Sequence, residues 1–341
     1  MRGLRYLAIV LMLVELALVT YLVHGVSLAR ESVAAYSISP VHSAARADNS
    51  DVLSQVPSPQ STYTSDDIYL AQRWGVNRID APQAWQIAEG DQSIIVAVLD
   101  TGIDEDNQSL ADRVAAEVNF TDSPTSDDLY GHGTHMAGTI AAIAPECRLM
   151  NVKVADDAGR CEASVVARGI IWAVDHGARI INISLCMRSS PDLEEAVDYA
   201  WNQGAVIVAA AGNTGGSTPA YPAYYEDCLA VASTDENDSL ALLSSHGDWV
   251  DVAAPGFNIY SEVPQNQYGY KSGTSPAVAH VSGVAALVFS VAEDSNGSGT
   301  ANDEVRQAIE NSCDSILADG AGSGRINAFQ AVIQTISSPS P

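Results

Sequence analysis

The run SIIVAVL, residues 93–99, ends directly at Asp100-Thr101-Gly102. A short run that is apolar at nearly every position is typical of a parallel strand buried on both faces. Stretches with helical spacing of apolar residues follow, at 164–175 and 192–201. Strand-like runs of the same style recur at 148–154, 179–185, 205–211 and 228–232. This alternation predicts an α/β fold with a mostly parallel central sheet and helices on both faces.

The composition of the 341-residue chain supports a large core and excludes one class of partner. Hydrophobic residues make up 47% and charged residues 17%, which is incompatible with wholesale disorder. Acidic residues number 42 against 16 basic ones, giving a net charge of −26. Because binding to a phosphate backbone needs clustered Lys and Arg, we expect no nucleic-acid partner. The 5 cysteines lack zinc-type spacing, and their pairing is left open by the sequence.

The amino terminus has the pattern of a targeting segment. Arg2 and Arg5 precede an apolar run, residues 6–23, and Ser27-Leu28-Ala29 offers small residues for cleavage. Residues 1–29 are therefore interpreted as a signal peptide or as a membrane anchor, and the sequence does not decide between them. We expect a protein that is secreted, or that is anchored on the outer face of the cell membrane through residues 6–23.

The rest of the chain divides by composition. Residues 30–62 are rich in Ser, Ala, Pro and Thr without a sustained apolar period, which predicts a flexible spacer or short pro-segment. Residues 63–335 are predicted to form the α/β domain, and residues 336–341 a tail.

Four polar residues stand at the ends of predicted strands or at the starts of helices. Asp100 follows the first strand, His132 lies in a glycine-rich turn, Asn213 follows a strand, and Ser275 precedes an apolar helix. Each alone has a structural explanation as a cap or turn residue. Together they supply a nucleophile, a base, an orienting carboxylate and an amide donor for an oxyanion, in a known chain order. Parallel sheets gather such groups at the carboxyl ends of their strands.

The segments around these residues resemble the signatures of the subtilisin-like serine proteases (subtilases, peptidase S8 family). The resemblance runs from about residue 63 to residue 333 and is strongest to thermitase-type members. Its motifs are Asp100-Thr101-Gly102, His132-Gly133-Thr134-His135, Ala211-Gly212-Asn213 and Gly273-Thr274-Ser275, with further similar stretches at 81–85, 221–225 and 250–256.

This resemblance implies a subtilisin-like three-layer fold and a serine endopeptidase that hydrolyses polypeptides through an acyl-enzyme. By the same resemblance, Asp100 orients His132, His132 is the general base and acid, Ser275 is the nucleophile, and Asn213 completes the oxyanion hole. The chemistry requires no cofactor, and we expect a monomer.

The resemblance also implies where a substrate binds. Two segments would flank a peptide that adds between them as a strand: Gly159-Arg160-Cys161 and Ser184-Leu185-Cys186. In both segments a cysteine stands where the family often has glycine. The cysteines could make the cleft narrower or sensitive to redox conditions. The favoured interpretation is that they are small apolar side chains that tune the substrate subsites. Ala210 and Gly212 would wall the primary pocket, with Ala220 near its floor, which predicts apolar substrate side chains of moderate size.

The chain departs from the family pattern in two places. Pro276 and Ala279 stand where the family usually has Met and Pro, which affects the start of the helix that carries Ser275. The segment after Ile143 is too short for the loop of the family's tight calcium site, which we expect to be absent, although Asp67 resembles one of its ligands. A weaker calcium site near Asp122, Asp127 and Asp128 is weighed against a solvated acidic loop, and the loop is favoured.

Three rival functions are considered. An aspartic protease needs two Asp-Thr-Gly motifs, and the chain has one. A zinc site at His132 and His135 lacks the helical i, i+4 spacing of zinc hydrolases. The remaining alternative is a catalytically weak or inactive, membrane-tethered subtilase-fold module that binds peptides.

Overall fold

The computed structural model describes residues 72–337 of the chain. Its central sheet consists of parallel strands in the order β2–β3–β1–β4–β5–β6–β7. The strand bounds are β1 (Ile95–Asp100), β2 (Val114–Asn119), β3 (Arg148–Lys153), β4 (Ile180–Ile183), β5 (Val206–Ala210), β6 (Cys228–Thr234) and β7 (Val252–Pro255). The predicted α/β class and the mostly parallel sheet are confirmed.

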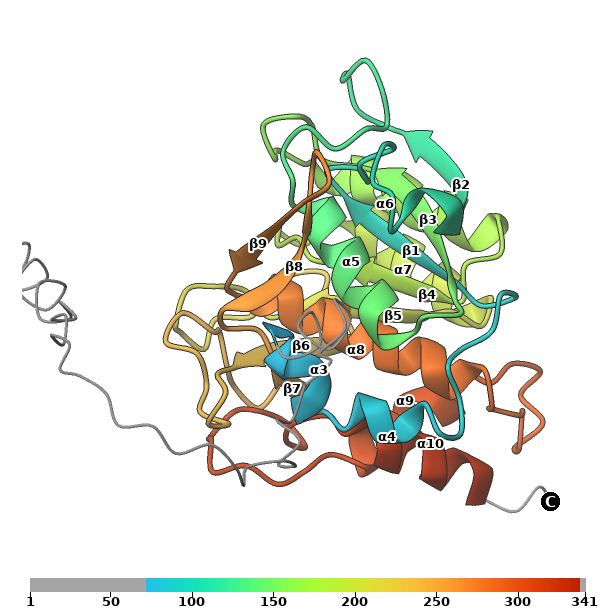
Figure 1. Ribbon diagram of the computed structural model, residues 1–341, viewed down its shortest axis with the longest axis vertical. Helices are drawn as coiled ribbons and strands as arrows, with labels where there is room; N and C mark the ends of the chain where they lie inside the picture. Colours follow the sequence, from blue (N-terminus) through green and yellow to red (C-terminus); the bar gives the residue numbers. More distant parts are fainter. Residues whose placement is uncertain (1–71, 338–341) are drawn as a thin grey trace, which may run out of the picture. The chain divides into compact units, whose positions relative to one another are not determined.

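Strand β1 shows why the sheet is covered on both sides. Its side chains alternate between two apolar clusters, with Val96 and Val98 in one and Ala97 and Leu99 in the other. Helices α5 (Gly133–Ile143) and α8 (Thr274–Phe289) contribute to the first cluster, and α6 (Ala163–Asp175) and α7 (Pro191–Asn202) to the second. In Figure 1, α5 and α8 lie in front of the sheet and α6 and α7 behind it.

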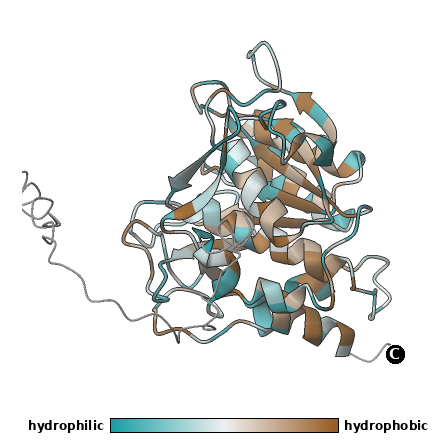
Figure 2. Cartoon of the chain, in the orientation of Figure 1, coloured by the Kyte–Doolittle hydropathy of each residue, from teal (hydrophilic) through white to brown (hydrophobic). Residues whose placement is uncertain are grey.

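Smaller elements surround this three-layer core. Strands β8 (Ile259–Val263) and β9 (Gln267–Lys271) form a separate antiparallel pair, and β8 packs against α5. In Figure 2 the central strands are mostly hydrophobic, whereas β9 is hydrophilic. The remaining elements are α3 (Trp74–Arg78), α4 (Ala81–Ala84), the 3-10 turn η1 (Ala111–Arg113), α9 (Asn302–Asn311) and α10 (Ala328–Ser337).

Inside this domain, the Tyr221–Pro222 peptide bond is cis. No helix within residues 72–337 is both long and apolar enough to cross a membrane. The expected targeting segment, residues 1–29, and the expected spacer, residues 30–62, lie outside the described residues.

Candidate active site

The fold brings the predicted catalytic residues to the ends of its elements. Asp100 is the last residue of β1, and His132 caps the amino end of α5. Ser275 is the second residue of α8, and Asn213 follows β5 by three positions. Because these strands are parallel, their carboxyl ends open on one edge of the sheet, where α5 and α8 also begin.

Asp100 and His132 form a close, buried pair. The His132 Nδ1 lies 2.7 Å from Asp100 Oδ1 and 2.9 Å from Oδ2, and Asp100 is fully buried. Since a carboxylate only accepts, Nδ1 is the donor, and Nε2 is left as the basic nitrogen. Burial lowers the pKa of His132, but the charge of Asp100 and its hydrogen bond outweigh burial and raise the pKa above the ordinary 6.5.

A second buried carboxylate, Asp128, connects the loops that carry this pair. Its Oδ1 accepts hydrogen bonds from the Thr101 hydroxyl at 2.8 Å and from the backbone N–H groups of Tyr130 and Gly131 at 3.1 and 2.7 Å. Its Oδ2 accepts from the N–H and the hydroxyl of Thr134, at 2.8 and 2.7 Å. The sequence suggested Asp128 only as a calcium ligand, whereas its oxygens are occupied by protein donors.

Direct backbone contact adds to the connection between the aspartate and histidine motifs. The Thr101 hydroxyl accepts from the Gly133 N–H at 3.0 Å, and a side chain at Gly133 would collide with the carbonyl oxygen of Gly102. Below them, the fully buried Lys153 donates to the carbonyl of Thr101 and pairs with Asp157 at 2.8 Å. The Asp100–His132 geometry is therefore built by neighbours that hold the two loops together.

Ser275 is tied to the segment that follows β4. Its Oγ donates to the carbonyl oxygen of Ser184 at 3.1 Å, and the Ser184 Oγ donates to the Ser275 carbonyl at 3.2 Å. Among the described residues, no hydrogen bond joins Ser275 to His132. The structure thus brings Asp100 and His132 into contact, while the Ser275 hydroxyl donates to the Ser184 carbonyl and not to His132.

Asn213 has one end of its amide anchored and the other open. The Asn213 Oδ1 accepts from the N–H of Thr274 at 2.9 Å and from its hydroxyl at 3.3 Å. Its Nδ2 makes no hydrogen bond within residues 72–337. Gly273 has a φ of 143°, and a Cβ there would come within 3.0 Å of the Asn213 amide, so a glycine is required beside it. Thr274, the residue before Ser275, therefore orients the Asn213 amide by holding its oxygen.

Gly212 lies between two of the residues predicted to shape a substrate pocket. A Cβ on Gly212 would lie 3.7 Å from the Ala220 methyl carbon and 3.7 Å from the Cys186 sulfur. The Cys186 thiol donates to the carbonyl oxygen of Ala210 at 3.4 Å. Ala210, Gly212, Ala220 and Cys186 therefore come together beside Asn213. All five cysteines, including Cys161 and Cys186, have free thiols.

The other predicted flanking segment is a turn rather than a long strand. Residues 156–160 close on themselves, and Arg160 is exposed and pairs with Asp156 at 2.7 Å. Cys161 makes an antiparallel bridge with Ala155. Tyr130 was not predicted from the sequence to lie here, although its ring lies against Gly159 and the residue is 53% exposed. A large aromatic residue two positions before His132 was the available signal.

Two further histidines, His135 and His280, are buried and serve the fold. His135 is fully buried, its Nε2 lies 3.0 Å from the Ile259 carbonyl, and burial lowers its pKa to about 3. His280 is bonded to the Pro276 carbonyl at 2.8 Å, and burial lowers its pKa to about 4. Within the described part of the chain, no group of three His, Cys, Asp or Glu side chains could hold a metal ion. Asp67 lies outside it, and the occupied oxygens of Asp128 do not fit a calcium ligand.

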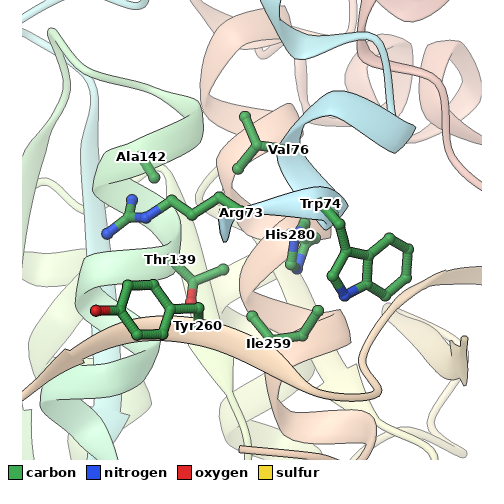
Figure 3. A pocket seen from close by; sticks show the side chains of 9 residues that line it. Arg73, Trp74, Val76, Thr139, Ala142, Ile259, Tyr260 and His280 are labelled. Atoms are coloured by element: carbon green, nitrogen blue, oxygen red, sulfur yellow. The ribbon is translucent and has the colours of Figure 1, made fainter. Parts of the chain in front are cut away.

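A small cavity lies away from this edge, between α3, α5, β8 and α8 (Figure 3). It is lined by Arg73, which precedes α3, by Trp74 of α3, and by Tyr260 and His280. Its volume is about 10 Å³, which is the lower limit for a single water molecule. Arg73 pairs with Glu262 at 2.7 Å, and both side chains are nearly fully buried. This region is therefore a packing junction rather than a ligand site.

Comparison with known proteins gives consistent matches. The model of the subtilase family, peptidase S8, matches residues 91–329. Thermitase of Thermoactinomyces vulgaris is 44% identical over 285 residues, covering 79% of this chain and 99% of the relative. Subtilisin BL of Lederbergia lenta is 39% identical over 269 residues, covering 76% of this chain and 97% of the relative. A solved protease structure from Pseudoalteromonas arctica has a TM-score of 0.71 at 26% identity, covering 78% of this chain and 97% of that one.

Proposed function

The chain belongs to the subtilase family and is a subtilisin-type serine endopeptidase, and we propose that Asp100, His132, Ser275 and Asn213 carry its reaction. The observation that carries this proposal is the bidentate contact of His132 Nδ1 with the buried Asp100, at 2.7 and 2.9 Å. That contact fixes the tautomer in which Nε2 can accept a proton. Because Asp100 is paired with an imidazole and not with a second aspartate, an aspartic-protease mechanism has no support.

In the proposed mechanism, the Ser275 oxygen attacks the peptide carbonyl carbon while its proton passes to His132 Nε2. The carbonyl π electrons move to the oxygen, which becomes the oxyanion. The Asn213 Nδ2 and the Ser275 N–H, which has no intrahelical acceptor in the first turn of α8, donate to it. Collapse expels the amine, which takes the proton from His132, and leaves an acyl-enzyme. Water, deprotonated by His132, then hydrolyses the ester and restores Ser275.

The first step requires the Ser275 hydroxyl to leave the Ser184 carbonyl. We propose that it does so by rotation about the Cα–Cβ bond, which exchanges one staggered side-chain position for another without moving α8. A substrate N–H that bonds to the Ser184 carbonyl would compete with Ser275 for that acceptor. Substrate binding would thereby favour the position in which Ser275 donates to His132, and catalytic hydrogen bonds commonly tighten only in the complex.

The substrate is proposed to be an extended polypeptide bound between residues 159–161 and 184–186. Such a strand would take its affinity from main-chain hydrogen bonds and its selectivity from pockets for alternate side chains. Ala210, Gly212 and Ala220 carry no side chain larger than a methyl group, which supports a preference for apolar side chains in the primary pocket. No cofactor takes part, since the four proposed residues supply every group that the reaction uses.

We also propose that residues 63–335 act as a single catalytic domain in a monomer, because one chain supplies the whole site. Residues 1–29 would direct export, and residues 30–62 would act as a spacer or short pro-segment. The site of action would be outside the cell, either secreted or on the outer face of its membrane. Amino-terminal sequencing of the exported protein would distinguish removal of residues 1–29 from their retention as an anchor.

The catalytic assignment is tested with Ser275→Ala and a fluorophosphonate probe. The wild-type chain should hydrolyse casein and take up the probe at Ser275, and the variant should do neither. Mass mapping of the labelled peptide identifies the nucleophile. Equal casein turnover by both proteins would refute the assignment of Ser275. A folded wild-type chain that neither labels nor turns over casein would favour the inactive peptide-binding alternative.

A further inference from the structure

Cys186 belongs to a segment that is hydrogen-bonded to the proposed nucleophile. Cys186 follows Ser184 by two residues, and Ser184 exchanges two hydrogen bonds with Ser275, at 3.1 and 3.2 Å. Asn182, two residues earlier, donates to the Ser184 hydroxyl at 3.1 Å and accepts from Ser282 of α8 at 3.1 Å. The segment after β4 is therefore joined to α8 by a continuous set of hydrogen bonds. These bonds hold the backbone two residues before position 186 in place relative to Ser275.

The thiol faces the strand end that leads to the oxyanion residue. It donates to the carbonyl of Ala210, the last residue of β5, at 3.4 Å. The sulfur also lies 3.7 Å from where a Cβ of Gly212 would be, which is ordinary contact distance. The Ala220 methyl lies equally close to that point. The thiol therefore occupies space beside Gly212, directly next to Asn213.

In its protonated form the Cys186 thiol is a small uncharged group that borders the proposed primary pocket. Although Cys186 keeps an exposed face, desolvation by the protein packed around its sulfur raises the pKa of the thiol to about 11, so the group is an S–H at neutral pH. A neutral thiol behaves as a small hydrophobic group with a weak donor. Its donor is used by the Ala210 carbonyl, which orients the thiol towards the end of β5, while the residue keeps an exposed face on the side where a substrate would bind.

We infer that Cys186 is a specificity-determining residue that shortens the primary pocket, so that the enzyme cleaves after small aliphatic residues and rejects aromatic ones. This inference rests on the proposed function and narrows it, because Ala210, Gly212 and Ala220 alone would accept larger apolar side chains. A glycine at position 186 would leave the space of one methylene and one sulfur open to the substrate. The pocket would then lengthen along the face of Gly212.

The test compares Cys186→Gly with the wild-type chain on peptide substrates that differ only in the residue before the cleaved bond, Ala or Phe. One methylene of pocket space changes selectivity by about 10–200-fold. We expect kcat/KM for the Phe peptide to rise by at least about 10-fold in Cys186→Gly, while that for the Ala peptide changes less than about 3-fold. Cys313→Ser is the matched control, because its thiol also donates to a carbonyl, that of Ile309 at 3.2 Å, and it lies outside the site.

A chemical probe gives a second readout that does not depend on the glycine variant folding. Methyl methanethiosulfonate transfers its CH₃S group to a thiol, forming a new S–S bond and releasing methanesulfinate and a proton. Treatment should lower turnover of the Ala peptide in the wild-type chain and in Cys313→Ser, because the CH₃S group added to Cys186 fills space in the primary pocket. Cys186→Ser should resist this loss, and dithiothreitol should reverse it.

The outcomes separate this inference from the proposed function. If the fluorophosphonate labels no variant, the catalytic assignment fails first. If all variants label at Ser275 but the Phe-to-Ala selectivity is the same in Cys186→Gly as in the wild type, the role of Cys186 is refuted. Equal inhibition of Cys186→Ser by the thiosulfonate would likewise refute it, because another thiol would then be responsible.

Discussion

Replacement of Asp128 by Asn should weaken the hydrogen bonds that hold the aspartate and histidine loops together. It changes the volume of the side chain very little. Asp128 is 1% exposed and accepts five hydrogen bonds, three at Oδ1 and two at Oδ2. An Asn whose oxygen takes the place of Oδ1 can keep the first three. Its NH₂ group then faces the N–H and the hydroxyl of Thr134. The hydroxyl can rotate to accept, but the backbone N–H cannot.

The expected loss follows from these contacts. One buried backbone N–H left without an acceptor costs about 1–3 kcal/mol. The three bonds that remain change from a charged to a neutral acceptor, and each weakens by about 1 kcal/mol. Because such effects within one cluster do not add fully, we expect a total loss of about 3–5 kcal/mol in the free energy of unfolding. The His132 ring should also lose its fixed position, and kcat/KM should fall at least about 10-fold, or about 1.4 kcal/mol.

The stability measurement is urea unfolding in a Ser275→Ala background, which removes self-digestion, and the kinetics are measured with Ser275 present. Asp122→Asn is the control, because Asp122 lies on the same loop but is exposed, and such changes stay within about 0.5 kcal/mol. An Asp128→Asn chain that unfolds within about 1 kcal/mol of its parent would show that these five bonds do not hold the loops together.

Three further predictions follow from the site. Only neutral His132 accepts the Ser275 proton, so its raised pKa predicts that kcat/KM falls as pH drops through a value above 6.5; a pH–rate profile checks this, and an acid limb below 6.5 would contradict it. The charge of Lys271 lowers the pKa of His132, so Lys271→Met should move that limb to higher pH; a downward shift would be inconsistent with it. Asn213→Ala should lower kcat by about 10²–10³-fold with little change in KM, measured on one peptide substrate, and an effect confined to KM would argue against an oxyanion role.

The sequence predicted the parts of the sheet that are buried on both faces. The runs that became β1, β3, β4, β5 and β6 are apolar because each contacts helices on both sides. Strand β2 was not predicted, since it lies at the sheet edge, where its residues alternate between exposed and partly buried positions. Strand β7 was not predicted either, and β8 and β9 carry polar and aromatic side chains on a separate pair. Their pairing depends on contacts that no local pattern records.

The catalytic candidates could be proposed from the sequence, but the groups that hold them could not. An acidic residue in a loop looks the same in sequence whether it is solvated, binds calcium or accepts backbone N–H groups. Asp128 was accordingly grouped with Asp122 and Asp127, although only Asp128 is buried against Thr101 and Thr134. The direction of a side chain is equally hidden, which is why the position of Cys186 was predicted and its contact with Ala210 was not.

The residues next to the catalytic groups explain why short motifs carried so much of the prediction. Thr101 follows Asp100 in the chain but uses its hydroxyl to hold the Gly133 N–H of the histidine motif. Thr274 precedes Ser275 but uses its N–H and hydroxyl to hold the amide of Asn213. Each motif thus contains a residue that serves its neighbour in space. A chance Asp, His, Asn or Ser at a strand end brings no such partner, so a match to the whole motif predicts an assembled site and not merely a residue type.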